Sequence, residues 1–277
     1  MLSADEWTGR TGDAWAAEWR RTDRSFADLS HQLNAAILAA APAGAFRALD
    51  IGCGAGGTSL ALAEARPDAA IVGVDLSREL LAVARARGGD RLTLVQGDAA
   101  TAAAEYGPFD LMVSRHGVMF FADPVAAFAA LRRQATPGVR LVFSCFRARA
   151  ENEWMRVVDA ALGTAAPAEE GYAPGPFGFA DAGFTGSMLA QAGWSEATPR
   201  SVDYIYVAGE GDEPLEDAMS FLGRIGPASR TLAAAPKSER AALRERLRTA
   251  LAPHVAGGRV TFRAAAWIWT ATAGDAA

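Results

Sequence analysis

The feature that most constrains this sequence is a regular alternation of short apolar segments with amphipathic ones across residues 46–146. The apolar segments are apolar on both faces, and helical segments of about ten residues separate them, which is typical of a parallel sheet covered by helices on both sides. Right-handed crossovers then predict a Rossmann-like, doubly wound α/β fold. The five expected strands are 46–52, 69–77, 92–98, 109–115 and 140–146.

The two flanks of this alternation have other patterns. Apolar residues in 13–41 recur at helical spacing, which predicts one long helix. Residues 214–252 are mostly helical in pattern, and the segments 200–209 and 259–273 are expected to form an antiparallel pair at one sheet edge. We expect three parts of one continuous domain: an N-terminal helical cap over 1–45, a core over 46–150, and acceptor or lid helices with C-terminal antiparallel strands over 151–277.

Composition excludes several classes of protein. The chain has 277 residues, 51% of them hydrophobic, and a net charge of −5 without a run of Lys or Arg, so a globular protein is expected and nucleic-acid binding is not. Two cysteines, Cys53 and Cys145, are no disulfide framework and favour a reducing compartment. The polar, acidic N-terminus argues against a signal peptide. The absence of an apolar run of about 18 residues argues against a membrane span. We expect a cytoplasmic protein.

A glycine loop follows the first expected strand. The segment LDIGCGAGGTSLALA begins at Leu49, and Gly52, Gly54 and Gly57 satisfy the pattern G-x-G-x-x-G. Asp75 ends the next strand, as expected for a carboxylate that binds ribose hydroxyls. On these residues alone the chain could bind NAD, so an NAD-dependent oxidoreductase is one interpretation.

Three further features favour a different ligand. Asp50 precedes the glycines, where a carboxylate is better matched to an ammonium group than to a pyrophosphate. Asp98 ends the third strand, where it can accept a hydrogen bond from an adenine amine. The fourth strand ends in SRHGVMFFADP, a polar turn followed by an aromatic pair. A ribose, an adenine and an amino-acid tail without pyrophosphate describe S-adenosylmethionine, whose tail the bare glycine backbone could approach closely.

The same segments, in the same order and spacing, resemble the motifs of class I S-adenosylmethionine-dependent methyltransferases, and most closely the small-molecule group related to ubiquinone and menaquinone biosynthesis. The resemblance covers about residues 46–147, and it implies a seven-stranded sheet whose last strand is antiparallel. It also implies that His116, just after the fourth strand, lines the methyl-transfer cleft. The residues expected to bind the cofactor are Asp50, Gly52, Cys53, Gly54, Asp75, Leu76, Asp98, Ala99, Ser114 and Arg115.

Each candidate has a plainer interpretation beside it. Asp98 could be a simple turn residue, and Cys53 is expected to be a small buried side chain rather than a nucleophile or metal ligand. His116 could bind the acceptor, or it could remove the acceptor's proton, since the unperturbed pKa of histidine is about 6.5. It could also only pack at the edge of the cofactor. His31, His254 and the pair Trp19/Arg20 are weaker candidates.

We therefore expect S-adenosylmethionine-dependent methyl transfer to a small-molecule acceptor by in-line displacement, with S-adenosylhomocysteine as product and no metal. A base such as His116 is needed only for acceptors that must lose a proton. The loop 174–178 and the helices of 214–252 are candidates for an apolar acceptor lid. A non-catalytic module that binds S-adenosylmethionine is a second alternative. A monomer and a homodimer are both compatible with the sequence.

Overall fold

The computed structural model describes residues 4–164 and 172–273. The sequence is rich in Gly and Pro over 166–183, which predicts a loop, and the first part of this loop, up to 171, lies outside the described residues. The helices are α1 (Ala4–Trp7), α2 (Arg10–Ala17), α3 (Trp19–Ser25), α4 (Ala27–Ala40), α5 (Gly57–Ala65), α6 (Arg78–Gly88), α7 (Ala99–Tyr106), α8 (Pro124–Arg132), α9 (Glu153–Leu162), α10 (Ala182–Gln191), α11 (Pro214–Leu222), α12 (Gly226–Ala234) and α13 (Arg240–Leu251). The strands are β1 (Phe46–Ile51), β2 (Ala69–Asp75), β3 (Thr93–Gln96), β4 (Phe109–Arg115), β5 (Ala135–Phe146), β6 (Trp194–Glu210), β7 (Val255–Ala256) and β8 (Arg259–Ala273).

One mixed sheet forms the centre of the molecule, in the order β3-β2-β1-β4-β5-β8-β6, with the short β7 paired to β8. Strands β1 to β5 pair with one another in parallel, and β8 runs antiparallel to both β5 and β6. The predicted Rossmann-like fold with its last strand antiparallel is confirmed, as is the expected antiparallel pair at the edge. The strand order reverses beside β1, which is where ligands bind in sheets of this kind.

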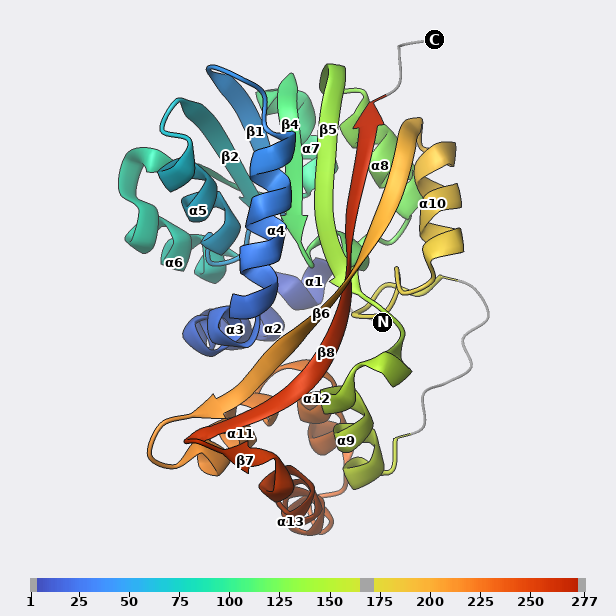
Figure 1. Cartoon of the computed structure of the whole chain (residues 1–277). Helices are drawn as coiled ribbons and strands as arrows, with labels where there is room; N and C mark the ends of the chain where they lie inside the picture. Colours follow the sequence, from blue (N-terminus) through green and yellow to red (C-terminus); the bar gives the residue numbers. More distant parts are fainter. Residues whose placement is uncertain (1–3, 165–171, 274–277) are drawn as a thin grey trace.

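Helices cover both faces of the sheet (Figure 1). α4, α5 and α6 lie on one face, while α7, α8 and α10 lie on the other. Local sequence signals start two of these helices. The Ser77 hydroxyl accepts a hydrogen bond from the Leu80 amide at the start of α6, and Asp123 caps α8 just before Pro124.

The prediction of one long helix over 13–41 is wrong, because the structure divides that segment into α2, α3 and α4. The breaks fall at Glu18 and Phe26, whose backbone angles leave the helical region. Both side chains are buried by distant parts of the chain: Glu18 pairs with Arg224, and Phe26 packs against Tyr204 and Phe146. Tertiary contacts thus override a local pattern that was continuous.

Strands β6 and β8 extend beyond the rest of the sheet as a two-stranded ribbon. β5 pairs with β8 only as far as Ala266, so residues 261–265 of β8 pair with β6 alone, while Arg259 and Val260 also pair with the short β7. Helices α9 and α11 pack on this ribbon, and α12 and α13 pack on these two helices. Together the four helices and the ribbon form what we call the lower lobe (Figure 1). The cap helices α1 to α3 lie between the lower lobe and the edge of the sheet where β1, β2 and β4 end. Within the described residues, no helix combines the length and apolarity needed to cross a bilayer.

Candidate active site

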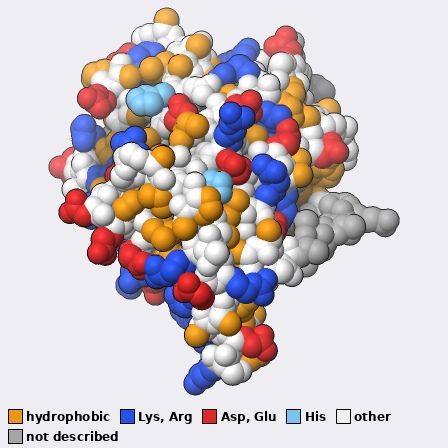
Figure 2. Space-filling model, turned by 60° about the horizontal axis from the view of Figure 1, so that its bottom comes forward, with side chains coloured by type: hydrophobic (Ala, Val, Ile, Leu, Met, Phe, Trp, Pro, Cys, Tyr) orange, Lys and Arg blue, Asp and Glu red, His pale blue; other side chains and the backbone are white. Residues whose placement is uncertain are grey.

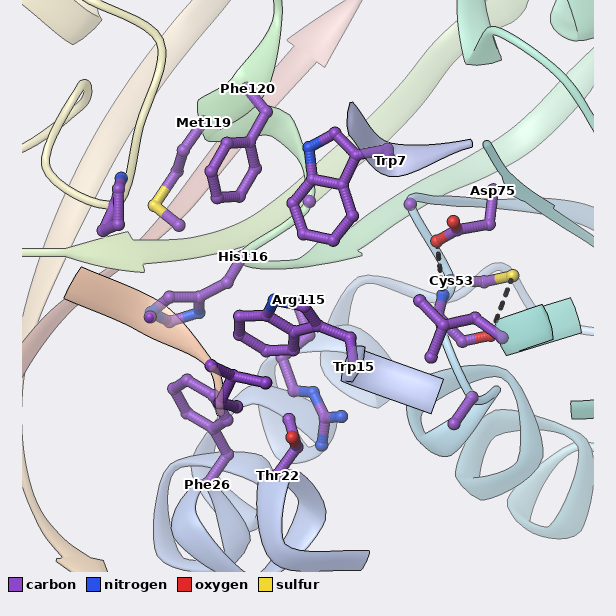
Figure 3. Close-up of a pocket in the computed structure, with 18 of the residues that line it drawn as sticks. Trp7, Trp15, Thr22, Phe26, Cys53, Asp75, Arg115, His116, Met119 and Phe120 are labelled. Atoms are coloured by element: carbon purple, nitrogen blue, oxygen red, sulfur yellow. Dashed lines mark hydrogen bonds between the residues drawn. The ribbon is translucent and has the colours of Figure 1, made fainter. Parts of the chain in front are cut away.

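A cavity of about 460 Å³ lies at the carboxyl ends of β1, β2 and β4, under the cap helices and against the lower lobe. It has two ends with different chemistry. One end is formed by the glycine loop, three aspartates and Arg115. The other is lined mainly by aromatic and aliphatic side chains. Figure 3 shows residues of both ends, with Asp75 and Cys53 on one side and His116, Phe26 and Met119 on the other.

The glycine loop connects β1 to α5. Gly52, Gly54 and Gly56 have φ angles of 64°, 55° and 78°, a region that side chains with a Cβ rarely adopt. At Gly52 space is also limited, because a Cβ there would lie 2.9 Å from the Gly117 Cα. At Gly52 and Gly54 the loop therefore presents bare backbone to the cavity.

Asp75 holds this loop to the end of β2. Its Oδ2 accepts a hydrogen bond from the Gly54 amide at 2.8 Å (Figure 3), and its Oδ1 accepts one from the Ser77 amide at 2.9 Å. Burial raises the pKa of Asp75, while the amides that bond to it oppose this rise. Each carboxylate oxygen keeps further acceptor capacity, which fits a pair of ribose hydroxyls.

Asp50 lies deeper in the same end and is 1% exposed. Its Oδ2 accepts a hydrogen bond from the Ser59 hydroxyl at 2.5 Å, and its Oδ1 is buried with no partner in the described part of the chain. Burial raises the pKa of Asp50 to about 6, despite the opposing Ser59 hydrogen bond and the charge of Arg115. A buried carboxylate oxygen without a donor fits an ammonium group, which would supply both charge and hydrogen bonds.

The other expected cofactor residues are divided between cavity and interior. Leu76, Ala99 and Cys53 line the cavity, and burial raises the pKa of the Cys53 thiol so that it remains protonated. Asp98 is an exposed lining residue whose Oδ1 caps α7 at the Thr101 amide. Ser114 does not line the cavity. Its side chain is fully buried, and its hydroxyl donates a hydrogen bond to the Ile51 carbonyl, which links β4 to β1 in the interior.

Arg115 lines the cavity and also fastens the cap to the core. Its Nη2 lies 2.7 Å from Oδ1 of Asp23 in α3, and Arg87 in α6 pairs with the other oxygen of Asp23 at 2.9 Å. Arg87 also donates to the Ala55 carbonyl in the glycine loop. We call Asp23, Arg87 and Arg115 the clasp, because these three side chains join cap, glycine loop and β4.

His116 lies between the two ends of the cavity. It follows β4 with a φ of 61°, and its ring packs against Phe26 and Phe146. Nδ1 is 2.8 Å from the Ser144 hydroxyl, whereas Nε2 is buried without a partner in the described residues. Burial, with the positive charge of Arg115, lowers the pKa of His116 to about 3. The expected pKa near that of free histidine is therefore wrong, because the buried ring loses the hydration that stabilises its charged form.

The apolar end contains three side chains that the sequence pattern did not single out: Trp7 of α1, Trp154 of α9 and Tyr206 of β6. Phe120, from the aromatic pair after β4, and Phe221, from the expected lid helices, line the same end. Trp19 was a weaker candidate, and Trp15 shares its apolar helical spacing within 13–41; both line the cavity. Their helical spacing was visible, but only the tertiary structure shows that they face a cavity.

The remaining candidates have mixed outcomes. Residues 221, 222 and 225–228 of the expected lid helices line the cavity, as does Pro176 of the loop 174–178. Phe177 packs against Trp154, while Phe179 is fully buried elsewhere. His31 is exposed on α4, His254 packs against Phe262, and Arg20 lies over the Trp19 ring; none of these three lines the cavity.

Comparisons with known proteins agree with this geometry. Residues 49–143 match the family described as methyltransferase domain. The demethylmenaquinone methyltransferase of Thermus thermophilus is 35% identical over 99 residues, which are 35% of this chain and 45% of that protein. The ubiquinone biosynthesis O-methyltransferase of Cronobacter sakazakii is 31% identical over 157 residues, 53% of this chain and 63% of that one. The chain thus spans about half to just under two thirds of these relatives.

Solved structures share the fold. The YcgJ protein of Bacillus subtilis aligns with a TM-score of 0.56 at 18% identity, covering 89% of this chain and 99% of that one. Phosphoethanolamine N-methyltransferase 2 of Haemonchus contortus, in complex with S-adenosylmethionine, aligns with a TM-score of 0.56 at 19% identity, over 99% and 61% of the two chains. The strand order, the glycine loop with Asp75, and these matches define an S-adenosylmethionine-dependent methyltransferase domain of class I. Residues 49–143 thus carry the methyltransferase domain, and part of the chain is similar in sequence to ubiquinone and menaquinone methyltransferases.

Proposed function

We propose that this protein transfers a methyl group from S-adenosylmethionine to a small, largely apolar acceptor. The observation that carries the proposal is one continuous cavity in which the glycine loop with Asp75 meets an end lined by aromatic rings. When bound, S-adenosylmethionine supplies an activated methyl group on a positively charged sulfur. Asp75 would hold the ribose, Asp98 the adenine amine and Asp50 the ammonium group of its tail.

The chemistry of the lining supports an uncharged acceptor. The charged residues that line the described cavity are Asp23, Asp50, Asp75, Asp98 and Arg115, and all lie in the cofactor end or the clasp. An ammonium or phosphate group in the apolar end would therefore lack a counter-ion and lose its hydration. An apolar ring would instead bury its surface against Phe26, Phe146 and Tyr206.

The protein's contribution to an in-line displacement would be alignment of the two reactants in a space from which water is excluded. His116 is placed to bind the acceptor as a neutral imidazole. Its low pKa argues against storage of a proton, because an imidazolium would be poorly solvated there. Ser144 would fix the orientation of the ring through Nδ1.

We also propose a cytoplasmic location and an acceptor that is neither nucleic acid nor protein. Both cysteines, Cys53 and Cys145, are free and buried, which suits a reducing compartment. Figure 2, which shows the molecule from the lower-lobe side, has basic, acidic and apolar side chains interspersed on the visible face. A nucleic-acid interface would favour clustered cations.

Calorimetry tests the first step. S-adenosylmethionine and S-adenosylhomocysteine should bind, and NADH should not, because the loop offers Asp50 rather than a partner for pyrophosphate. Tight NADH binding without a response to either sulfur compound would overturn the proposal in favour of an oxidoreductase. Transfer of tritiated methyl groups to a panel of phenols, ketones and amines then separates an enzyme from a non-catalytic binding module.

His116 gives a second test, with the best acceptor of that panel. His116→Phe keeps the ring packing against Phe26 and Phe146 but removes both nitrogens, so kcat/KM should fall by about tenfold, the value of one lost hydrogen bond. S-adenosylhomocysteine affinity should not change. Since the imidazole stays neutral above about pH 3, the wild-type rate should show no inflection near the pKa of free histidine. An inflection near pH 6.5 that His116→Phe abolishes would instead identify His116 as a proton acceptor.

A further inference from the structure

Trp154 occupies a central position in the apolar end of the cavity. It lies in the first turn of α9, is 5% exposed, and lines the cavity from the lower lobe. Its indole stacks on Tyr206 with a centroid distance of 5.2 Å and an angle of 13°, and on Phe177 at 6.4 Å and 25°. These rings fix the plane of the indole, so its polar edge has a defined direction.

The indole nitrogen of Trp154 lacks a partner. Nε1 is buried and makes no hydrogen bond to the residues that the structure describes. In contrast, Nε1 of Trp194 donates to the Phe128 carbonyl at 3.0 Å, and Nε1 of Trp267 donates to the Ala180 carbonyl at 2.9 Å. A buried donor without an acceptor is costly, and such groups in native proteins call for an explanation.

The neighbourhood of Trp154 is where an acceptor molecule would bind. The Trp154 and His116 rings both pack against Phe146, at centroid distances of 5.6 and 4.4 Å. His116 in turn adjoins Gly117, whose Cα approaches the glycine loop at Gly52. Trp154 therefore lies on the side of His116 away from the cofactor end, within the apolar lining.

An indole N–H can only donate, so its missing partner must be a hydrogen-bond acceptor. We propose that Trp154 determines specificity by donating this hydrogen bond to an oxygen on the ring system of the methyl acceptor. The oxygen is an uncharged one, that of a ketone, ether or phenol, because the surrounding cavity offers no counter-ion to a charged group. The inference rests on the proposed methyl transfer, which defines the apolar end as the acceptor site.

Three two-ring probes of nearly equal size test this proposal: 1-indanone, which has a ketone oxygen, indane, which has none, and 1-aminoindane, which carries an ammonium group. Calorimetry first measures S-adenosylhomocysteine binding, and then each probe is titrated into protein saturated with S-adenosylhomocysteine. Wild-type protein should bind indanone about three- to tenfold more tightly than indane, as expected for one net hydrogen bond, and aminoindane most weakly. Trp154→Phe keeps an aromatic ring and should remove the preference for indanone without changing S-adenosylhomocysteine affinity.

Trp194→Phe is the matched control, because Trp194 is a buried tryptophan outside the cavity whose N–H is already bonded. This variant should keep the preference for the ketone. A readout on wild-type protein avoids any effect of the substitution on folding: in ¹⁵N spectra, the Trp154 indole N–H resonance should move on addition of indanone but not of indane.

The outcomes separate the two proposals. Failure to bind S-adenosylhomocysteine would contradict the proposed function itself. If S-adenosylhomocysteine binds but wild-type protein does not distinguish indanone from indane, or Trp154→Phe retains the distinction, the role of Trp154 is refuted while methyl transfer stands. A Trp154 resonance that stays in place with indanone would refute it equally.

Discussion

Asp75 accepts one backbone hydrogen bond on each carboxylate oxygen, from the Gly54 and Ser77 amides. One side chain thereby fixes the glycine loop and offers its remaining lone pairs to the cavity. Asp50 differs, because one of its oxygens has no donor and its pKa is raised to about 6. At the scale of single residues, these differences support our proposal that Asp75 would bind neutral hydroxyls and Asp50 a cationic group.

Asp75→Ala should weaken S-adenosylhomocysteine binding by about tenfold to a hundredfold, because two ribose hydroxyls lose a charged acceptor worth about 2–3 kcal/mol in total. Calorimetry on the folded variant measures the change. Asp68→Ala, at an exposed aspartate that pairs with Arg66 away from the cavity, is the control and should bind normally. An unchanged dissociation constant for Asp75→Ala would remove this residue from the site.

At the scale of elements, the cap is held over the cavity by the clasp rather than by the chain connection alone. Asp23 in α3 pairs with Arg115 at the end of β4 and with Arg87 in α6, and all three side chains are largely buried. The Arg87 guanidinium also lies over the ring of Trp19, with its central carbon 4.2 Å from the ring centroid. Opening of the cap requires these contacts to break together.

Asp23→Asn should therefore speed S-adenosylhomocysteine release, by about tenfold if the lost pairing is worth about 1–2 kcal/mol. Stopped-flow tryptophan fluorescence can follow the release, since Trp7, Trp15 and Trp19 line the cavity. Glu79→Gln is the control: it breaks an ion pair with exposed Arg78 on the outside of α6 and should not change the rate constant of S-adenosylhomocysteine release. Equal release rates in wild type and Asp23→Asn would show that the cap does not depend on the clasp.

At the scale of the whole molecule, ion pairs join the N-terminal cap to the lower lobe. Asp217 in α11 binds Arg21 and Arg24 of α3, each at 2.6 Å, and also accepts from the Glu210 amide. Burial raises the pKa of Asp217, but the Glu210 amide and the two arginines lower it more, so the net shift is downward. Residues nearly 200 positions apart in the chain are thereby held around one cavity.

The sign of that shift predicts how stability depends on pH. A carboxyl with a lowered pKa stabilises the fold above its unfolded value near 3.8, and this contribution disappears as the pH falls through the folded pKa. Asp217→Asn should cost about 1–2 kcal/mol of unfolding free energy at pH 7 and much less at pH 3. Urea unfolding at the two pH values measures the difference. A cost as large at pH 3 as at pH 7 would show that the ion pairs contribute nothing.

The sequence by itself determined the sheet, the glycine loop and the cofactor end. These depend on local signals: the apolar strands of 46–146, glycines at positive φ, and carboxylates at strand ends, where the parallel arrangement brings Asp50, Asp75 and Asp98 to one edge. The position of His116 was predictable for the same reason, since it follows β4 directly. Its pKa was not, because that depends on how completely distant side chains bury the ring.

Tertiary structure decided the apolar end. Trp7, Trp154, Tyr206 and Phe221 are widely separated in the chain, and nothing in their local spacing says that they share one cavity. The breaks at Glu18 and Phe26 and the interior position of Ser114 depend likewise on contacts with distant residues. Local sequence specifies which backbone conformation a segment adopts. The lining of a cavity between lobes depends instead on which faces of distant helices and strands pack together when the hydrophobic core is buried.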